Sequence, residues 1–255
     1  MSEREKPGLA VVIPALNEEE PICGLVSDVL GVAARPDLPV TIRGVYVVDN
    51  GSTDQTAERA RAAGATVVDE PRRGYGRACL SGVLAAGDAE IIALMDGDRS
   101  DVPAELPLLL APLLAGEADL VIGSRTLGTH EPGSLTVQQR FGNGLAAVLL
   151  RLLYGVRVTD IGPFRVIRKR DLLRLDMREM TYGWSVEMIA CAARNGLRVK
   201  EVPVTYRNRA GGESKVSGNV QASIRAGYRI IGTIFRVRAG RKQHPSSPGA
   251  KDSRA

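Results

Sequence analysis

Two aspartates flank a glycine directly after the apolar run EIIALM, at Asp96, Gly97 and Asp98. Two carboxylates at the mouth of a strand can hold a hard divalent cation, which typically takes one or two carboxylates together with substrate phosphate oxygens and water. Gly97 has no side chain, so a diphosphate can approach the backbone closely there. Aspartates are also common in turns, but Asp49 is expected to end a neighbouring strand. The pattern therefore favours a Mg²⁺ or Mn²⁺ site at Asp96 and Asp98.

Polar residues also follow other apolar runs in the first half of the chain. PALNEEE, DNGSTD and GSR each come at the end of such a run. In doubly wound sheets, ligands bind beyond the carboxyl ends of the strands. A buried structural network can explain one polar strand end, but several together predict a ligand site.

The elements that must position these residues follow from the hydrophobic pattern. Short β-branched runs alternate with helical patterns. The runs lie at 9–14, 45–49, 65–69, 90–96 and 119–123, and the helical patterns at 18–33, 53–63, 75–87 and 103–115. Apolar strands that alternate with helices predict an α/β fold, with a mostly parallel sheet covered on both faces. Ser52 or Thr53 is expected to cap the second helix.

The second half of the chain has a different pattern. Residues 137–153 predict a helix that is apolar nearly all round, apart from Arg140 and Arg151. Such a helix must be buried in the protein, in a partner or in lipid. Further elements are expected at 163–167, 169–176, 184–195, 198–207 and 219–237.

The last of these helices is amphipathic. At about 100° per residue, Arg225, Arg229 and Arg236 fall within roughly 40° of one another. The opposite side holds Val220, Ile224, Tyr228, Ile231, Ile234 and Phe235. The helix either packs on the domain with a solvated basic face or lies in a membrane interface, and the basic tail favours the second interpretation.

Charge is unevenly distributed along the 255 residues. The whole net charge of +5 resides in 236–255, so the globular part has no charge excess that would favour nucleic acid. A basic end suits an anionic membrane surface. We expect a tail at 1–8, one catalytic domain at 9–218, the amphipathic helix at 219–238 and a disordered basic tail at 239–255.

Several common sites are absent from the sequence. PALNEE stands where a dinucleotide-binding fold has GxGxxG. Three widely spaced cysteines form no CxxC pair and indicate a reducing compartment.

In GYGRACLSG, Gly74 either begins a tight loop before a helix or brings the backbone close to a nucleotide.

The motifs taken together resemble one family. VVIPALNEEE, VVDNGSTDQT, GYGRACLSG, DGDRSD, GSR, DIGPFR and EVPVTYRNRAGGESKVSG occur in this order. The chain resembles family 2 glycosyltransferases of the GT-A fold, and among them the dolichyl- and polyprenyl-phosphate sugar synthases. The resemblance implies a Rossmann-like, mostly parallel sheet and metal-dependent transfer from a nucleotide sugar.

The resemblance also implies roles for particular residues. Asp96 and Asp98 match the metal-binding DxD, and Ser100 stands where mannose synthases often have a glutamine ligand. Arg209 and Lys215 match a mobile basic loop that closes on the diphosphate. The positions that hold the nucleoside are matched by Pro14, Ala15, Asn17, Glu18 and Asp49.

The chain departs from relatives whose acceptor is a sugar hydroxyl. It has neither their ED or DD base nor the QxxRW of processive enzymes. A hydroxyl nucleophile needs a base, whereas a phosphate monoester with a second pKa of about 6 is already largely dianionic. Arginine forks suit a phosphate, and Arg125, Arg140 and Arg165 are either such ligands or solvated surface residues.

We therefore expect a glycosyltransferase that moves a hexose from GDP-mannose or UDP-glucose to a polyprenyl phosphate, with inversion. It is expected to be cytoplasmic and peripheral at the cytoplasmic membrane face, with a homo-oligomer or membrane partner possible. One alternative acceptor is a small soluble phosphorylated metabolite. The other alternative is a catalytically idle module that only binds sugar nucleotides.

Overall fold

The computed structural model describes residues 6–211 and 220–240, the last segment without side chains for 220–226. Its centre is a seven-stranded sheet in the order β3-β2-β1-β4-β6-β5-β7. Only β6 runs antiparallel to its neighbours, so the prediction of a mostly parallel sheet is confirmed. The strands are β1 (Gly8–Ala15), β2 (Thr41–Asp49), β3 (Thr66–Asp69), β4 (Ile91–Leu94), β5 (Leu120–Ser124), β6 (Arg165–Arg168) and β7 (Val199–Pro203).

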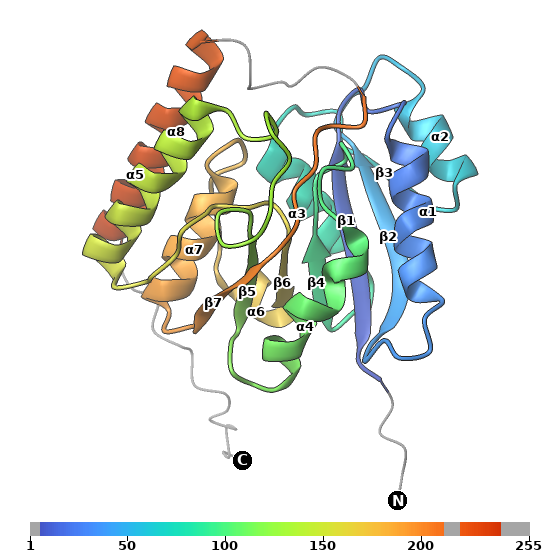
Figure 1. Ribbon diagram of the computed structural model, residues 1–255, viewed down its shortest axis with the longest axis horizontal. Helices are drawn as coiled ribbons and strands as arrows, with labels where there is room; N and C mark the ends of the chain where they lie inside the picture. The colour runs from blue at the N-terminus through green and yellow to red at the C-terminus, as the bar shows by residue number, and fades with distance from the viewer. Residues whose placement is uncertain (1–5, 212–219, 241–255) are drawn as a thin grey trace, which may run out of the picture.

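Helices cover both faces of this sheet (Figure 1). One apolar cluster joins the sheet to α1 (Ile22–Ala33), α2 (Thr56–Ala62) and α4 (Leu106–Leu114), which follows the 3₁₀ turn η1 (Pro103–Glu105). A second cluster joins it to α3 (Tyr75–Ala85), α5 (Val137–Tyr154), α6 (Lys169–Arg174), α7 (Trp184–Arg194) and α8 (Val220–Ala239). The near-continuous apolar strands are therefore buried from both sides.

Close packing fixes where α3 begins. A Cβ atom on Gly82 would collide with Val12 of β1 and lie 2.8 Å from Cγ2 of Val48 on β2. The absence of a side chain lets the helix lie directly on the two strands. Gly74, which precedes the helix, is thereby held at the carboxyl edge of the sheet.

The predicted cap of the second helix is wrong. α2 begins at Thr56, and neither Ser52 nor Thr53 caps it. Instead, the Ser52 hydroxyl accepts the backbone N–H of Asn17 at 3.0 Å, and Thr56 Oγ1 accepts that of Glu18 at 2.8 Å. Both hydroxyls bind the loop after β1, and α1 starts at Ile22 rather than at residue 18. They therefore fix the position of Glu18 instead of stabilising a helix end.

The last helix packs on the domain, against α7 and α5. The apolar side that the sequence predicts is divided: Ile234 is buried, whereas Tyr228 and Phe235 are exposed. Arg229 and Arg236 do not form a freely solvated basic face, because both pair with Glu179, at 3.6 and 2.9 Å. Arg225 lies among the side chains that are not described, as does Ile224. The expected tail at 239–255 lies outside the described residues from 241 onward.

Candidate active site

A cavity of about 780 Å³ opens beyond the carboxyl ends of β1, β2, β4 and β5. The edge where the parallel strands end therefore forms the floor of the site, as the polar strand ends predict. Nine of the residues singled out in the sequence line this cavity: Pro14, Ala15, Glu18, Gly74, Asp96, Gly97, Asp98, Arg125 and Arg209.

Four other predicted residues, Asn17, Asp49, Arg140 and Arg165, do not line the cavity, and Arg140 is exposed on the surface. Asn17 braces the loop after β1, with its Oδ1 accepting the backbone N–H of Thr53 at 2.8 Å. Asp49 accepts the backbone N–H of Ser52 at 3.0 Å, and Arg165 lies in the core. Lys215 lies outside the described residues.

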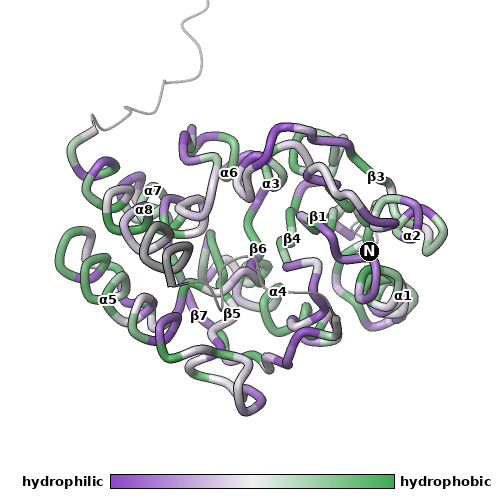
Figure 2. The backbone as a smooth tube through the Cα atoms, turned by 90° about the horizontal axis from the view of Figure 1, so that it is seen from above, coloured by the Kyte–Doolittle hydropathy of each residue, from purple (hydrophilic) through white to green (hydrophobic). Residues whose placement is uncertain are grey.

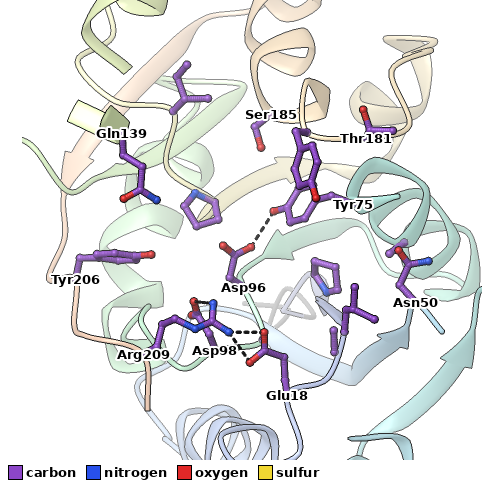
Figure 3. Close-up of a pocket in the computed structure, with 18 of the residues that line it drawn as sticks. Glu18, Asn50, Tyr75, Asp96, Asp98, Gln139, Thr181, Ser185, Tyr206 and Arg209 are labelled. Atoms are coloured by element: carbon purple, nitrogen blue, oxygen red, sulfur yellow. Dashed lines mark hydrogen bonds and ion pairs between the residues drawn. The ribbon is translucent and has the colours of Figure 1, made fainter. Parts of the chain in front are cut away.

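Asp96 lies at the centre of the cavity (Figure 3). Its carboxylate accepts the hydroxyl hydrogen of Tyr75 at 3.0 Å. Burial, and then the negative charge of Asp98, raises the pKa of Asp96 to about 7. Asp96 therefore needs a positive charge nearby before it can ionise fully beside Asp98.

Arg209 supplies positive charge to the other carboxylates (Figure 3). Its Nη1 donates to Asp98 at 2.8 Å, and its Nη2 donates to both Glu18 oxygens at 2.6 and 2.8 Å. Burial acts to lower the pKa of Arg209, but Asp98 and Glu18 raise it above its usual value. The guanidinium is therefore a fixed cation that joins the ends of β1 and β4.

The donor set suits a divalent cation that shares its ligands with a substrate. Within the described residues, no group of three or more His, Cys, Asp or Glu side chains could enclose a metal ion. Asp96 and Asp98 offer two carboxylates, the number that Mg²⁺ usually takes beside substrate phosphates. Beside them, Ser100 Oγ and Asp101 Oδ1 are buried without a hydrogen-bond partner in the described structure. Such orphaned oxygens fit a site that is completed by a ligand.

Gly97 lets the loop after β4 pack closely against the end of β1. A Cβ atom there would lie 3.1 Å from the carbonyl oxygen of Pro14 and 3.4 Å from Cβ of Ala15. The two strand-end loops therefore approach one another as closely as a bare backbone allows.

Arg125 lines the cavity, but its charge is already matched. The buried carboxylate of Asp160 accepts its Nε at 2.7 Å and its Nη2 at 2.8 Å. Burial opposes the charge, but these bonds raise the pKa of Arg125 above its usual value. Tyr206 lies under the guanidinium, 4.8 Å from ring centre to Cζ. Arg125 is thus held rigidly at the wall of the cavity.

Arg165, unlike Arg125, is buried in the core and does not line the cavity. It is 1% exposed, and its Nη1 donates to the backbone oxygen of Ser185 at 3.0 Å. Its Nη2 donates to the carbonyl of Gly162. Burial lowers its pKa. In this conformation Arg165 fastens the 160–163 loop to α7 rather than meeting a ligand in the cavity.

The far wall of the cavity comes from residues that the sequence pattern does not single out, although Tyr206 lies within the motif EVPVTYRNRAGGESKVSG. Gln139 and Tyr206 lie on one side, and Thr181 and Ser185 on another (Figure 3). Asn50 could have been identified, because it directly follows β2; it donates to the carbonyls of Glu70 and Arg72 and accepts the N–H of Gly74 at 2.7 Å. The remaining four are ordinary polar residues of helices and loops.

Carboxylates are confined to one side of the cavity. Among the described residues that line it, the acidic ones are Glu18, Asp96 and Asp98, all at strand ends. Glu187, near the position of a family 2 base, accepts the backbone N–H groups of Arg178 and Glu179 instead. Among the described residues, the far wall thus presents hydroxyls and amides without a general base.

Comparison with known proteins identifies the chain. Residues 10–175 match the profile of glycosyl transferase family 2. A glycosyltransferase of Mycobacterium tuberculosis is 41% identical over 218 residues, which cover 85% of this chain and 93% of that protein. An undecaprenyl-phosphate mannosyltransferase of Micrococcus luteus is 32% identical, covering 82% of this chain and 87% of that protein. A dolichyl-phosphate hexose transferase of Haloferax volcanii is 33% identical, covering 83% and 88%.

A solved structure has the same fold. Glucosyl-3-phosphoglycerate synthase from Mycobacterium tuberculosis, in complex with Mn²⁺, uridine diphosphate and phosphoglyceric acid, superposes with a TM-score of 0.72. It is 25% identical, and the match covers 91% of this chain and 79% of that one. The fold is therefore GT-A, and the protein is an enzyme that transfers glycosyl groups. The chain belongs to glycosyl transferase family 2.

Proposed function

We propose that this enzyme transfers a hexose from a nucleotide sugar to the phosphate of a polyprenyl phosphate, with inversion at the anomeric carbon. The observation that carries the proposal is the division of the cavity. Its carboxylates and Arg209 gather at the strand ends, whereas the far wall lacks a general base among the described residues. A largely dianionic phosphate needs no base, but it needs positioning.

The strand-end side suits the donor. Pro14, Ala15 and Glu18 are proposed to hold the nucleoside, with Asn17 and Asp49 shaping the loops beneath it. Gly74 and Gly97 let the backbone approach the diphosphate. A Mg²⁺ or Mn²⁺ ion held by Asp96 and Asp98 would neutralise charge on the diphosphate as it departs. Arg209, together with Lys215, would bind the same leaving group.

The opposite side suits the acceptor. The rigid Arg125 and the polar groups of Gln139 and Ser185 surround a space into which a phosphate oxygen can point. Direct attack by that oxygen on the anomeric carbon breaks the bond to the diphosphate and inverts the configuration. Relatives named for dolichyl and undecaprenyl phosphate support a lipid acceptor, met at an anionic membrane surface.

A second acceptor class has support of its own. The structural neighbour was solved with phosphoglyceric acid, a small soluble phosphate. Phosphoglyceric acid offers a hydroxyl as well as a phosphate, and a hydroxyl nucleophile would need help in losing its proton. The donor chemistry is the same for both candidates, so the acceptor alone separates them.

The decisive experiment offers both acceptors to one enzyme preparation. Labelled GDP-mannose and UDP-glucose are each incubated with Mn²⁺ and either undecaprenyl phosphate in detergent or 3-phosphoglycerate. We expect an organic-extractable, mild-acid-labile product with the lipid and no turnover with phosphoglycerate. Transfer to phosphoglycerate alone would replace the proposal by the soluble acceptor. Tight nucleotide binding without turnover on either acceptor would indicate an idle binding module.

A further inference from the structure

The outward face of α5 is apolar, although the helix also packs on the core. The buried side of the helix holds Ala146 and Leu150. At about 100° per residue, a second apolar stripe lies roughly 160° away from them. It consists of Val137, Phe141, Leu145, Val148 and Leu152, with Phe141 75% and Leu152 74% exposed. The helix therefore has an apolar side that nothing in the described structure covers.

The neighbouring helix extends this face. α8 packs beside α5, and the hydroxyl of Tyr154 on α5 donates to the carbonyl of Ile234. Tyr228 is 77% and Phe235 50% exposed, while Ile234 and Val237 are buried beneath them. Figures 1 and 2 both place α5 and α8 together at one edge of the molecule, away from β1 and β3.

The charged residues of the two helices of this face have one sign. The sequence has no Asp or Glu between Pro132 and Val158, nor from residue 220 to 240. On α5, Arg140 and Arg151 lie beside the apolar stripe, both exposed, and neither forms an ion pair with a described residue. A second copy of this face would bring like charges together, whereas an anionic bilayer is complementary to it. No helix of the described residues is long and apolar enough to cross a membrane, so the helix would lie in the interface plane.

The face is also connected to the cavity. The side of α5 that turns inward supplies Gln139 and Asn143 to the cavity wall, and α8 supplies Ile230. Thr136 caps α5: its Oγ1 accepts the backbone N–H of Gln139 at 3.2 Å. This cap fixes the start of α5 at the cavity rim. One helix therefore faces the cavity on one side and solvent with an apolar stripe on the other.

We propose that the outward stripe of α5, flanked by Arg140 and Arg151, docks the enzyme on an anionic phospholipid bilayer and places the acceptor wall of the cavity at the lipid surface. This inference rests on the proposed lipid acceptor for its purpose, but the docking itself requires no acceptor. It assigns the membrane contact chiefly to α5, whereas the sequence pattern favours the last helix.

The test compares a triple variant with a matched control. Phe141→Ser, Val148→Ser and Leu152→Ser are combined, and the control combines Leu84→Ser, Leu108→Ser and Leu127→Ser, exposed residues that lie elsewhere. Binding is measured by co-sedimentation with phosphatidylcholine vesicles, with and without phosphatidylglycerol. The wild type and the control should bind more strongly with phosphatidylglycerol and less strongly with salt. The α5 variant should bind about tenfold or more weakly, and Arg151→Gln should reduce only the salt-sensitive part.

A second measurement separates docking from function. Transfer to a water-soluble short-chain prenyl phosphate should be unchanged in the α5 variant, whereas transfer to undecaprenyl phosphate in vesicles should fall with the binding. If the α5 variant loses vesicle binding while the wild type transfers sugar to no prenyl phosphate, the docking proposal is supported. The proposed acceptor is then wrong. Equal vesicle binding by variant and wild type would overturn the docking proposal. The docking proposal would also be overturned if sedimentation shows that the wild type is a dimer and the α5 variant a monomer.

Discussion

The guanidinium of Arg209 lies 2.8 Å from Asp98 and 2.6 Å from Glu18, although these residues are 111 and 191 positions away in the chain. One cation thus joins the loop after β4 to the loop after β1 on the floor of the cavity. Its Nε is buried without a hydrogen-bond partner in the described structure. That N–H remains available to an anion, while both terminal nitrogens neutralise carboxylates.

Removal of this cation should weaken donor use. Arg209→Ala should lower kcat/KM for the nucleotide sugar by more than about tenfold, the loss of a charge-assisted contact of about 1.5–3 kcal/mol. The affinity for nucleoside diphosphate should fall towards the affinity for nucleoside monophosphate, because the proposed contact of Arg209 is to the diphosphate. Calorimetric titration with each nucleotide and Mn²⁺ measures this difference. Arg207→Ala, an exposed neighbour, is the control, and equal losses in the two variants would contradict the assignment.

The carboxylate of Asp98 should be needed for metal and not for folding. Asp98→Asn should abolish transfer and Mn²⁺-dependent nucleotide binding, because a strand-end carboxylate serves the ligand rather than the core. The circular dichroism spectrum should be unchanged. Asp88→Asn, an exposed carboxylate on another loop, should leave both properties intact. Near-normal turnover of Asp98→Asn would show that the metal assignment is wrong.

The fold and half of the site could be predicted from the sequence, for a physical reason. Apolar strand runs fix the sheet, and parallel strands bring their ends to one edge, so Glu18, Asp96 and Asp98 meet without further information. Gln139 and Ser185 gave no such signal, since helix packing positions them and their residue types are common on any surface. Arg165 was expected either at a ligand or on the solvated surface, because its burial against backbone carbonyl groups cannot be predicted from the residues beside it in the sequence. The outward apolar face of α5 could not be predicted from the sequence, because the sequence does not show which side of the helix packs on the core.

Asp96 should make the stability of the metal-free enzyme depend on pH. Its pKa is raised to about 7 in the folded protein by burial and by Asp98, and an unfolded aspartate has a pKa of about 3.9. The folded state therefore holds the extra proton between these values, and its stability falls as pH rises through that window. Asp96→Asn removes the penalty. At pH 8 without metal, the variant should exceed the wild type by about 1 kcal/mol or more in free energy of unfolding, with little difference near pH 4.

Urea unfolding at several pH values measures whether the stability of the metal-free enzyme falls as pH rises. The variant should also be inactive, so that greater stability accompanies loss of function. A wild-type enzyme whose stability rises from pH 5 to 8 relative to Asp96→Asn would contradict a raised pKa at this position. Mn²⁺ with nucleotide should reverse the order, because binding stabilises only the ionised wild-type site.

Glu179 should hold α8 in place. Its buried carboxylate accepts Arg236 at 2.9 Å and the backbone N–H of Thr181 at 2.9 Å, and Arg229 lies 3.6 Å away. Burial opposes its charge, but Thr181 and Arg236 lower the pKa of Glu179 below its usual value. A lowered pKa stabilises the folded state fully above the unfolded pKa of about 4.3, and that stability is lost as pH falls through the lowered folded-state pKa.

Glu179→Gln keeps the shape and removes the charge. Because both arginines are about half exposed, we expect a loss of only about 1 kcal/mol in free energy of unfolding at pH 7. This loss should shrink as pH falls through the lowered pKa of Glu179. Amide hydrogen exchange in residues 227–240 should accelerate, while exchange in β1 and β4 stays unchanged. Since Thr181 lines the cavity, the KM for the acceptor should rise more than the KM for the donor. Glu58→Gln, an exposed glutamate of α2, controls for the loss of one negative charge. If α8 exchanges at the wild-type rate in Glu179→Gln, then apolar packing alone holds the helix.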